Sequence, residues 1–327
     1  MAKRQKLTLQ QKRRVAKSQR KKLQDIPVDD NDLGPGIEGI VVSRFGEQAD
    51  VAEPNGQVHR VYLRQNLGSC VSGDRIIFRL GKDGGVIEAI EERRSELTRP
   101  TPHSGIKTIV ANIDRIFIVV APFPDYSSTI LDRYLVACEL AGIPTQIVFN
   151  KQDLITPEQH DFFTQQIQLY QSIGYTVHTV SAKSDLGVEE LKHQMLGHES
   201  ILVGQSGVGK SSLINKILPS SQIATGEVSE NSRLGTHTTT ASRVYFFDSG
   251  HIIDSPGVRE FGLTHMEADQ IIYGFRDLLP FAAECKFRNC RHLNEKGCAI
   301  AQAVEAKAVS KQRLSNYQSI INSIATS

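Results

Sequence analysis

Residues 36–99 alternate apolar and polar positions in short runs, and turn-forming residues separate these runs. GIVVSRFG and QVHRVYLR are short runs typical of strands. The Asn55-Gly56 pair between two such runs is a strong hairpin signal. The pattern therefore predicts five short strands, enough for a small closed barrel.

An OB-fold is the natural candidate for this barrel, and OB-folds commonly bind oligonucleotides. An SH3-like barrel or a purely structural barrel would give the same pattern. Five arginines supply positive charge: Arg44, Arg60, Arg64, Arg75 and Arg79.

From residue 107 the rhythm changes to strands alternating with helices, which is typical of a doubly wound parallel sheet. Continuous apolar runs predict buried parallel strands. The predicted strands are 115–121, 143–149, 176–182 and 200–203, and the predicted helices are 127–141, 157–173 and 187–195. YFFDSGHIIDSPG adds two more strands. The chain becomes helical after about residue 265, and 299–323 is again helix-forming.

The charge is distributed unevenly in a chain of 327 residues. Residues 1–24 hold ten of the 38 Lys and Arg residues and no Asp or Glu, so the remainder carries 28 basic against 36 acidic residues. A basic arm before an acidic body predicts a disordered tail that seeks phosphate groups, although a merely solubilising terminus would look the same. No apolar run approaches the roughly 18 residues that a membrane span needs, and no secretory signal is recognisable.

GQSGVGKS, residues 204–211, fits the phosphate-loop pattern G-x-x-x-x-G-K-[ST] between a predicted strand and a predicted helix. Gly207 and Gly209 let backbone N–H groups converge, and the helix N-terminus adds positive potential. We expect Lys210 to reach the outer phosphates and the Ser211 hydroxyl to ligate Mg²⁺.

NKQD, residues 150–153, leaves a buried strand and has the residues to bind guanine. Asn150 can bond the N7/O6 edge and also brace the phosphate loop, and Asp153 can accept from guanine N1–H and its exocyclic amine. Adenine presents an acceptor at N1, so Asp153 disfavours it. The Lys151 stem can lie over the base. Ser181-Ala182-Lys183 ends another strand, where the Ala182 N–H can reach guanine O6.

DSPG, residues 254–257, ends the strand HIID. Asp254 is placed to hold Mg²⁺ through water, and the Gly257 N–H can contact a γ-phosphate. The polar segment before it predicts a first switch, in which one of Thr238 to Thr240, with Thr239 favoured, ligates Mg²⁺. The residues that we expect to bind GTP are Asn150, Lys151, Gln152, Asp153, Ser181, Ala182, Lys183, Gly204, Gln205, Ser206, Gly207, Val208, Gly209, Lys210, Ser211, Ser212, Thr239, Asp254 and Gly257.

The base tetrad precedes the phosphate loop, which predicts a circularly permuted GTPase domain. A site built at the carboxyl ends of parallel strands survives permutation of the chain. The tetrad then connects backwards to the barrel, whereas DSPG leads forward to the C-terminal region. Val258 stands where many GTPases place a water-orienting Gln, so intrinsic turnover is expected to be slow. His237 is the internal candidate to position the attacking water, and packing or RNA contact are its alternatives.

Cys285, Cys290, His292 and Cys298 form a Cys₃His set that suits one closed, structural zinc site. The other two cysteines, Cys70 and Cys138, are isolated. Reduced thiols without metal remain the alternative. Basic residues flank the cluster, so we expect it to present positive charge to RNA: Lys286, Arg288, Arg291 and Lys296.

The motif order, the phrases GQSGVGKSSLIN, THTTT and IDSPGVREFGL, and the spacing C-x4-C-x-H-x5-C resemble the RsgA (YjeQ) family of small-subunit-dependent GTPases. The resemblance covers nearly the whole chain. It implies an N-terminal OB-fold, a permuted P-loop GTPase centre and a C-terminal zinc domain, and it also points to His237 as the catalytic residue. It further implies contact with 16S rRNA. The expected boundaries are an arm and linker at 1–35, the OB-fold at 36–100, the GTPase domain at 101–264 and the helical zinc domain at 265–327.

We therefore expect a cytoplasmic, monomeric GTPase that acts late in assembly of the bacterial 30S subunit, with Mg²⁺ accompanying GTP and GDP as product. Stimulation by the small subunit would time its release. One alternative is a GTP-gated RNA-binding checkpoint module whose turnover is incidental. Another is a translation factor that prefers 70S ribosomes.

Overall fold

The computed structural model describes residues 32–64, 67–82, 84–101, 105–218, 242–255 and 267–325. The chain divides into two compact units, Met1–Cys70 with Asp74–Glu92, and Val71–Gly73 with Arg93–Ser327. The predicted basic arm at 1–24 lies outside the described residues.

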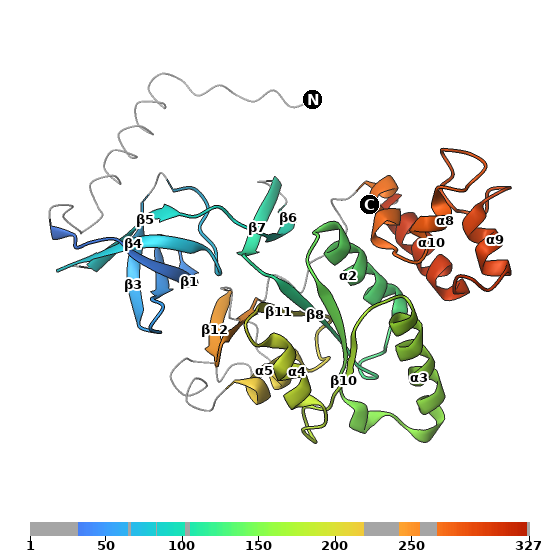
Figure 1. Ribbon diagram of the computed structural model, residues 1–327, viewed down its shortest axis with the longest axis horizontal. Helices are drawn as coiled ribbons and strands as arrows, with labels where there is room; N and C mark the ends of the chain where they lie inside the picture. The colour runs from blue at the N-terminus through green and yellow to red at the C-terminus, as the bar shows by residue number, and fades with distance from the viewer. Residues whose placement is uncertain are drawn as a thin grey trace. The chain divides into compact units, whose positions relative to one another are not determined.

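The first unit is a closed barrel with the strand order β1-β2-β3-β5-β4 (Figure 1). Its strands are β1 (Ile37–Phe45), β2 (Gln48–Ala52), β3 (Val58–Leu63), β4 (Arg75–Gly81) and β5 (Gly84–Ile90). The β3–β5 pair is parallel and the others are antiparallel. This arrangement confirms the predicted OB-fold. Alternate residues such as Val41, Val61 and Phe78 fill the interior.

The second unit is built on a six-stranded sheet with the order β10-β9-β8-β11-β13-β12. Its strands are β8 (Arg115–Val120), β9 (Thr145–Phe149), β10 (Val177–Thr179), β11 (Glu199–Val203), β12 (Arg243–Phe247) and β13 (Gly250–Asp254). Five strands are parallel, and β12 is antiparallel to β13. Only two residues join β12 to β13, which is too short for a parallel crossover.

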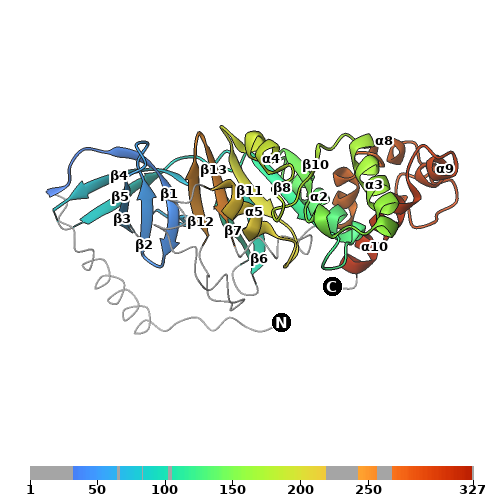
Figure 2. The ribbon, with the colours of Figure 1, turned by 90° about the horizontal axis from the view of Figure 1, so that it is seen from below.

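Helices cover the sheet as a doubly wound fold requires. They are α2 (Ser128–Leu140), α3 (Pro157–Ser172), α4 (Val188–Met195) and α5 (Lys210–Ile217). The apolar faces of α4 and α5 share one core with Phe117 and Val119 of β8. Both views place α2 and α3 together, away from α4 and α5 (Figures 1 and 2).

A hairpin that the sequence pattern did not indicate lies just before the sheet. It joins β6 (Glu96–Thr101) to β7 (Gly105–Ala111), with Leu97 and Val110 buried between the strands and the rest of the unit. The first unit ends at Glu92, so this hairpin belongs with the GTPase sheet rather than with the barrel. Backbone pairing with β7, which alternation within residues 93–101 does not reveal, decides where these residues go.

The C-terminal region is helical and packs on α2. Its elements are η4 (Ala268–Gly274), α8 (Leu279–Ala282), α9 (Ala299–Glu305) and α10 (Lys311–Ala325). The predicted run 299–323 is thus two helices, and Lys307 between them has a left-handed φ of 60°. Within the described part of the chain, no helix is both long enough and apolar enough to cross a bilayer.

Candidate nucleotide site and metal centre

The phosphate loop joins β11 to α5, and its glycines have conformations that other residues rarely adopt. The φ angles of Gly204, Gly207 and Gly209 are 142°, 82° and 97°. A Cβ on Gly204 would lie 2.2 Å from the carbonyl oxygen of Val119, and one on Gly209 would lie 2.3 Å from Asn150 Nδ2. Glycine is therefore needed here both for backbone angle and for close approach.

Lys210 begins α5 and folds back over the loop. Its Nζ donates to the carbonyl oxygens of Gly204 and Gln205 at 2.7 Å each. These bonds hold two carbonyls at the ammonium, and the N-terminus of α5 lies beside them, where the positive end of a helix favours an anion. Ser211 and Ser212 occupy the exposed first turn, where a hydroxyl can reach a metal ion.

Asn150 joins the base tetrad to two other loops. Its side chain is buried, with 1% exposure. Nδ2 donates to the Val208 carbonyl oxygen in the phosphate loop at 2.9 Å, and Oδ1 accepts from the Ala182 N–H at 3.3 Å. Residues 58 and 32 positions away in sequence thereby meet at one side chain. The structure brings the three predicted motifs together at the carboxyl ends of β9, β10 and β11.

Asp153 is oriented by the loop that follows β10. The buried Ser181 hydroxyl donates to Asp153 Oδ1 at 2.5 Å, and Ser181 Oγ accepts from the Ser184 N–H at 3.2 Å. Lys183 Nζ lies 4.0 Å from Asp153 Oδ2 and is largely exposed. A carboxylate fixed through one oxygen is oriented to accept hydrogen bonds from a base.

Lys151 crosses from the tetrad to the phosphate loop. Its φ of 60° turns the backbone into the left-handed region. Nζ donates to the carbonyl oxygens of Phe123, at 3.0 Å, and of Gly207. Gln152 donates through Nε2 to the Phe149 carbonyl oxygen at 3.1 Å, which braces the end of β9.

Asp254 ends β13 at the same edge of the sheet, and it is exposed. The next residue, Ser255, shares a 2.6 Å hydrogen bond with Ser242. Ser206 of the phosphate loop is also exposed. Six residues singled out by the sequence lie outside the described residues: His237, Thr238, Thr239, Thr240, Gly257 and Val258.

Between α8 and α9, the structure brings together the four residues of the predicted Cys₃His set: Cys285, Cys290, His292 and Cys298. Their ligand atoms all lie within 4.8 Å of one another. The Ala299 N–H at the start of α9 donates to Cys285 Sγ at 3.4 Å, which suits a thiolate. The cluster can hold one metal ion.

The geometry of this cluster fits an ion with tetrahedral coordination. In tetrahedral coordination, bonds of about 2.3 Å from the ion to sulfur and about 2.0 Å to nitrogen place the sulfur and nitrogen atoms roughly 3.5 Å apart. His292 Nδ1 is 3.5 Å from Sγ of both Cys285 and Cys298. Burial lowers the pKa of His292, which favours the neutral imidazole that ligates metals. Gln318 of α10 donates to the His292 carbonyl oxygen at 2.8 Å, tying the cluster to the last helix.

Comparison with known proteins decides the family. A family model described as RsgA GTPase matches residues 90–264. The chain is 47% identical over 336 residues to the Small ribosomal subunit biogenesis GTPase RsgA of Haemophilus influenzae (strain PittEE), covering 99% of this chain and 97% of the relative. The chain belongs to the RsgA GTPase family. The protein of the same name from Proteus mirabilis (strain HI4320) is 44% identical, covering 98% of this chain and 96% of the relative.

Solved structures agree with the RsgA assignment. YjeQ from Thermotoga maritima is 30% identical, with a TM-score of 0.73 over 90% of this chain and 100% of that one. YloQ, described as a circularly permuted GTPase, is 26% identical, with a TM-score of 0.70 over 91% of this chain and 98% of that one. The permuted motif order is thus a property of a known fold.

In the barrel of this RsgA-family chain, most of the five arginines that supply positive charge are paired with groups of the barrel itself. Arg60 pairs with Asp50 at 2.7 Å, and Arg64 pairs with Glu88 at 2.8 Å. Arg44 and Arg79 donate to main-chain carbonyls within the unit. Residue type alone did not reveal these partners, of which Asp50 and Glu88 lie on the neighbouring strands β2 and β5.

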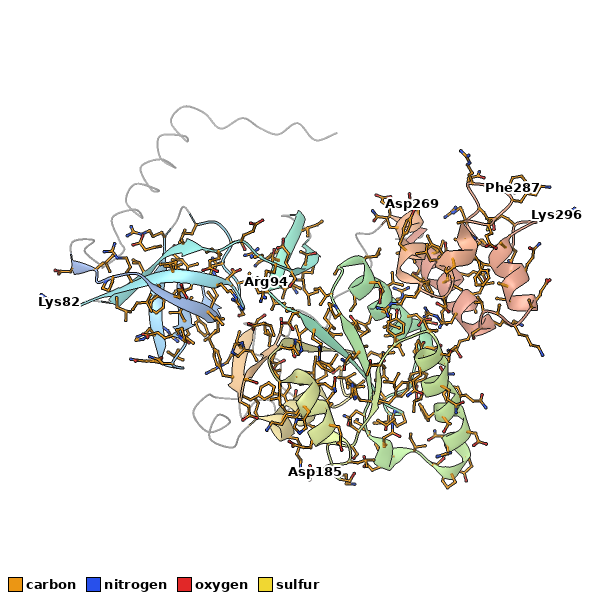
Figure 3. The ribbon with its side chains drawn as sticks, in the orientation of Figure 1. Lys82, Arg94, Asp185, Asp269, Phe287 and Lys296 are labelled. Carbon is orange, nitrogen blue, oxygen red and sulfur yellow. The ribbon has the colours of Figure 1, made fainter. Side chains whose placement is uncertain are left out.

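The metal region presents its charged and aromatic side chains outward. Phe287 is exposed, with Lys286 Nζ 5.6 Å from its ring centre. Figure 3 labels Phe287 and Lys296, whose side chains point away from the surrounding helices. Arg288 and Lys296 are exposed as well.

The sequence motifs do not include one segment of the nucleotide edge, by which we mean the edge of the sheet at the carboxyl ends of β8, β9, β10 and β11. The loop 121–127 follows β8 and contacts both Lys151 and the phosphate loop through Phe123 and Pro124. The available signal was positional, because every loop at the carboxyl end of a parallel strand is a candidate for the site.

Proposed function

We propose that this chain is a GTP hydrolase that acts in biogenesis of the small ribosomal subunit. The observation that carries the proposal is Asn150, which contacts the phosphate loop and the Ala182 loop at once. Such a junction unites base and phosphate recognition at one sheet edge. The biological setting rests on the names of the full-length RsgA relatives.

Guanine selectivity comes from Asp153 and the loop at Ala182. Asp153 accepts from guanine N1–H and the exocyclic amine, and the Ala182 N–H donates to O6. Adenine would place its N1 lone pair against the carboxylate, which disfavours it. The Lys151 stem covers the base while its ammonium is held by two carbonyls.

Phosphate and Mg²⁺ binding use the loop 204–212 and two further positions. Lys210 neutralises the outer phosphates, and Ser211 ligates Mg²⁺. Thr239 completes the Mg²⁺ shell in the GTP state, while Asp254 holds the ion through water. The Gly257 N–H contacts the γ-phosphate.

Hydrolysis uses His237 to position the attacking water, because Val258 cannot orient one through an aliphatic side chain. The test is a His237→Ala protein with wild-type GDP affinity. Loss of stimulated turnover supports the role, and undiminished turnover rules it out.

The protein binds 16S rRNA through the basic arm, the barrel and the outward-facing residues of the metal region. The metal is one structural Zn²⁺, because four protein ligands leave no open position for a substrate. The chain acts as a cytoplasmic monomer. RNA binding should weaken with salt by about one log-log slope unit for each phosphate contact.

The decisive experiment measures steady-state GTP turnover with and without purified 30S subunits. Stimulation by 30S, and its loss in Lys210→Ala, supports the proposal. Preference for 70S particles would indicate a translation factor instead.

Val258 favours one second candidate, a GTP-gated RNA-binding checkpoint whose own turnover is incidental. In that case GTP changes the affinity for 30S subunits, but the subunits leave turnover unchanged. The same assay, combined with 30S pelleting in GTP and in GDP, separates the two functions.

A further inference from the structure

The aromatic residue Phe123 lies at the nucleotide edge although no nucleotide motif contains it. It belongs to the loop between β8 and α2, and 66% of its surface is exposed. With most of its surface exposed, Phe123 contributes little free energy through hydrophobic burial. Its position beside a ligand site therefore calls for another explanation.

Phe123 contacts the ammonium group of Lys151 in two ways. Its carbonyl oxygen accepts from Lys151 Nζ at 3.0 Å, and its ring centre lies 5.6 Å from the same nitrogen. The Gly207 carbonyl oxygen is the other acceptor. Within about 6 Å, an aromatic ring attracts a cation. The ammonium is thus held from the phosphate loop and from the loop of Phe123.

The loop that carries Phe123 is itself anchored. A Cβ on Gly207 would lie 3.3 Å from Cδ of Pro124, so the loop abuts the phosphate loop directly. Tyr126 packs its ring against Phe149 and Phe163 at centroid distances of 5.7 and 5.6 Å. These contacts fix the loop to the end of β9, from which Lys151 emerges.

We propose that Phe123 is a positioning residue for Lys151, and that it slows the release of guanine nucleotide. By holding the ammonium, Phe123 keeps the aliphatic stem of Lys151 extended between the tetrad and the phosphate loop. The extended stem provides the apolar surface on which the base rests. The inference rests on the proposed binding of GTP and GDP at this site, and it adds a residue that determines how long the nucleotide stays bound.

The test measures dissociation of N-methylanthraniloyl-GDP by stopped-flow displacement with unlabelled GDP. Phe123→Ala should raise the dissociation rate about two- to tenfold, as expected for loss of a partly exposed cation–aromatic contact. Phe123→Trp should restore the wild-type rate, because an indole ring binds a cation at least as well. Phe162→Ala is the matched control, since Phe162 is also exposed and packs on Tyr126.

A double-mutant cycle with Lys151→Met isolates the mechanism, because methionine keeps an apolar stem but lacks the ammonium. If Phe123 acts through the ammonium, Phe123→Ala should change the rate less than about 1.7-fold, the smallest difference that such cycles resolve, in the Lys151→Met protein. An equal effect in both backgrounds, an unchanged rate in Phe123→Ala, or an equal increase in Phe162→Ala would overturn the inference. Failure of the wild-type protein to bind the labelled GDP would instead refute the proposed function.

Discussion

The nucleotide edge and the contact between α2 and the C-terminal helices both gather polar side chains from distant parts of the chain, but they do so differently. The nucleotide edge uses backbone carbonyls and partly exposed side chains such as Lys151 and Asp153. The helical contact buries full charges, since Asp132 and Arg313 are both 0% exposed. The nucleotide edge can therefore exchange a ligand with solvent, whereas the polar groups of the helical contact bind only one another.

The buried charges are fully partnered. The Arg313 guanidinium donates to Asp277 at 2.8 and 3.0 Å and also contacts Asp132. Asp132 accepts further bonds from Asn316, at 2.7 Å, and from the Tyr170 hydroxyl, at 2.8 Å. Such a network stabilises only while complete, because loss of one partner leaves another charge buried and unpaired.

A second contact reinforces the first at the other end of α2. Arg276 pairs with Glu139 at 2.7 Å, and Gly274 lets the backbone approach Val136 so closely that a Cβ would lie 2.7 Å away. The C-terminal region therefore packs on α2, the helix that follows the loop of Phe123. Chain connectivity alone had linked this region to the segment after Asp254.

The largest effect expected is from metal removal. Chelation, or Cys290→Ser, should unfold residues 285–298, since structural zinc supplies on the order of 10 kcal/mol of folding free energy. Hydrogen exchange should rise in this region while GDP affinity stays near the wild-type value, because the nucleotide loops are built on the sheet. Cys138→Ala, which leaves the cluster intact, should retain one zinc per chain by elemental analysis. A metal-free protein with unchanged protection would contradict the prediction.

Arg313→Met should lower the free energy of unfolding by about 3–5 kcal/mol, because it leaves the buried carboxylate of Asp132 and the partly buried carboxylate of Asp277 without their cation. Urea denaturation monitored by circular dichroism measures the change. Arg276→Ala is the comparison variant, since this half-exposed arginine should contribute at most about 1 kcal/mol. Equal losses from the two variants would show that burial does not distinguish the two contacts.

Asn150→Ala should lower both stability and GDP affinity, because it removes the hydrogen-bond partner of the Val208 carbonyl and of the Ala182 N–H. We expect a loss of about 1–3 kcal/mol in stability. GDP affinity should fall about 10- to 100-fold as the loops lose their common contact. Isothermal titration and thermal unfolding test the two parts, with Gln152→Ala as the neighbouring control. A loss of stability with full affinity would mean that Asn150 serves packing alone.

Lys216→Ala should have the smallest effect. Lys216 pairs with Asp185 at 2.7 Å, but both side chains are exposed, so the pair contributes roughly 0–1 kcal/mol. Neither the unfolding midpoint in urea nor GDP affinity should change measurably. A loss of stability comparable to that of Arg313→Met would contradict the argument that burial determines how much stability is lost with an ion pair.

Much of the fold could be read from periodicity. The expected helices at 127–141 and 157–173 correspond to α2 and α3 within two residues at each end. The hairpin of β6 and β7 could not be read in this way, because pairing with a neighbour rather than local alternation defines it. The left-handed Lys307, which divides the last helical run, also has no clear local signal, since lysine is a good helix former.

The sequence by itself determined where the phosphate-loop pattern, the NKQD tetrad and the Cys₃His set lie, and that the tetrad precedes the phosphate loop. Each is a short motif, and its chemistry depends on residue types a few positions apart. Only the tertiary structure decided which loops share Asn150, which arginines of the barrel are already paired, and where the C-terminal helices pack. Those choices depend on contacts such as Asp132 with Arg313, which are 181 positions apart. No local pattern records such a pair, because its partners become neighbours only when the core closes around them.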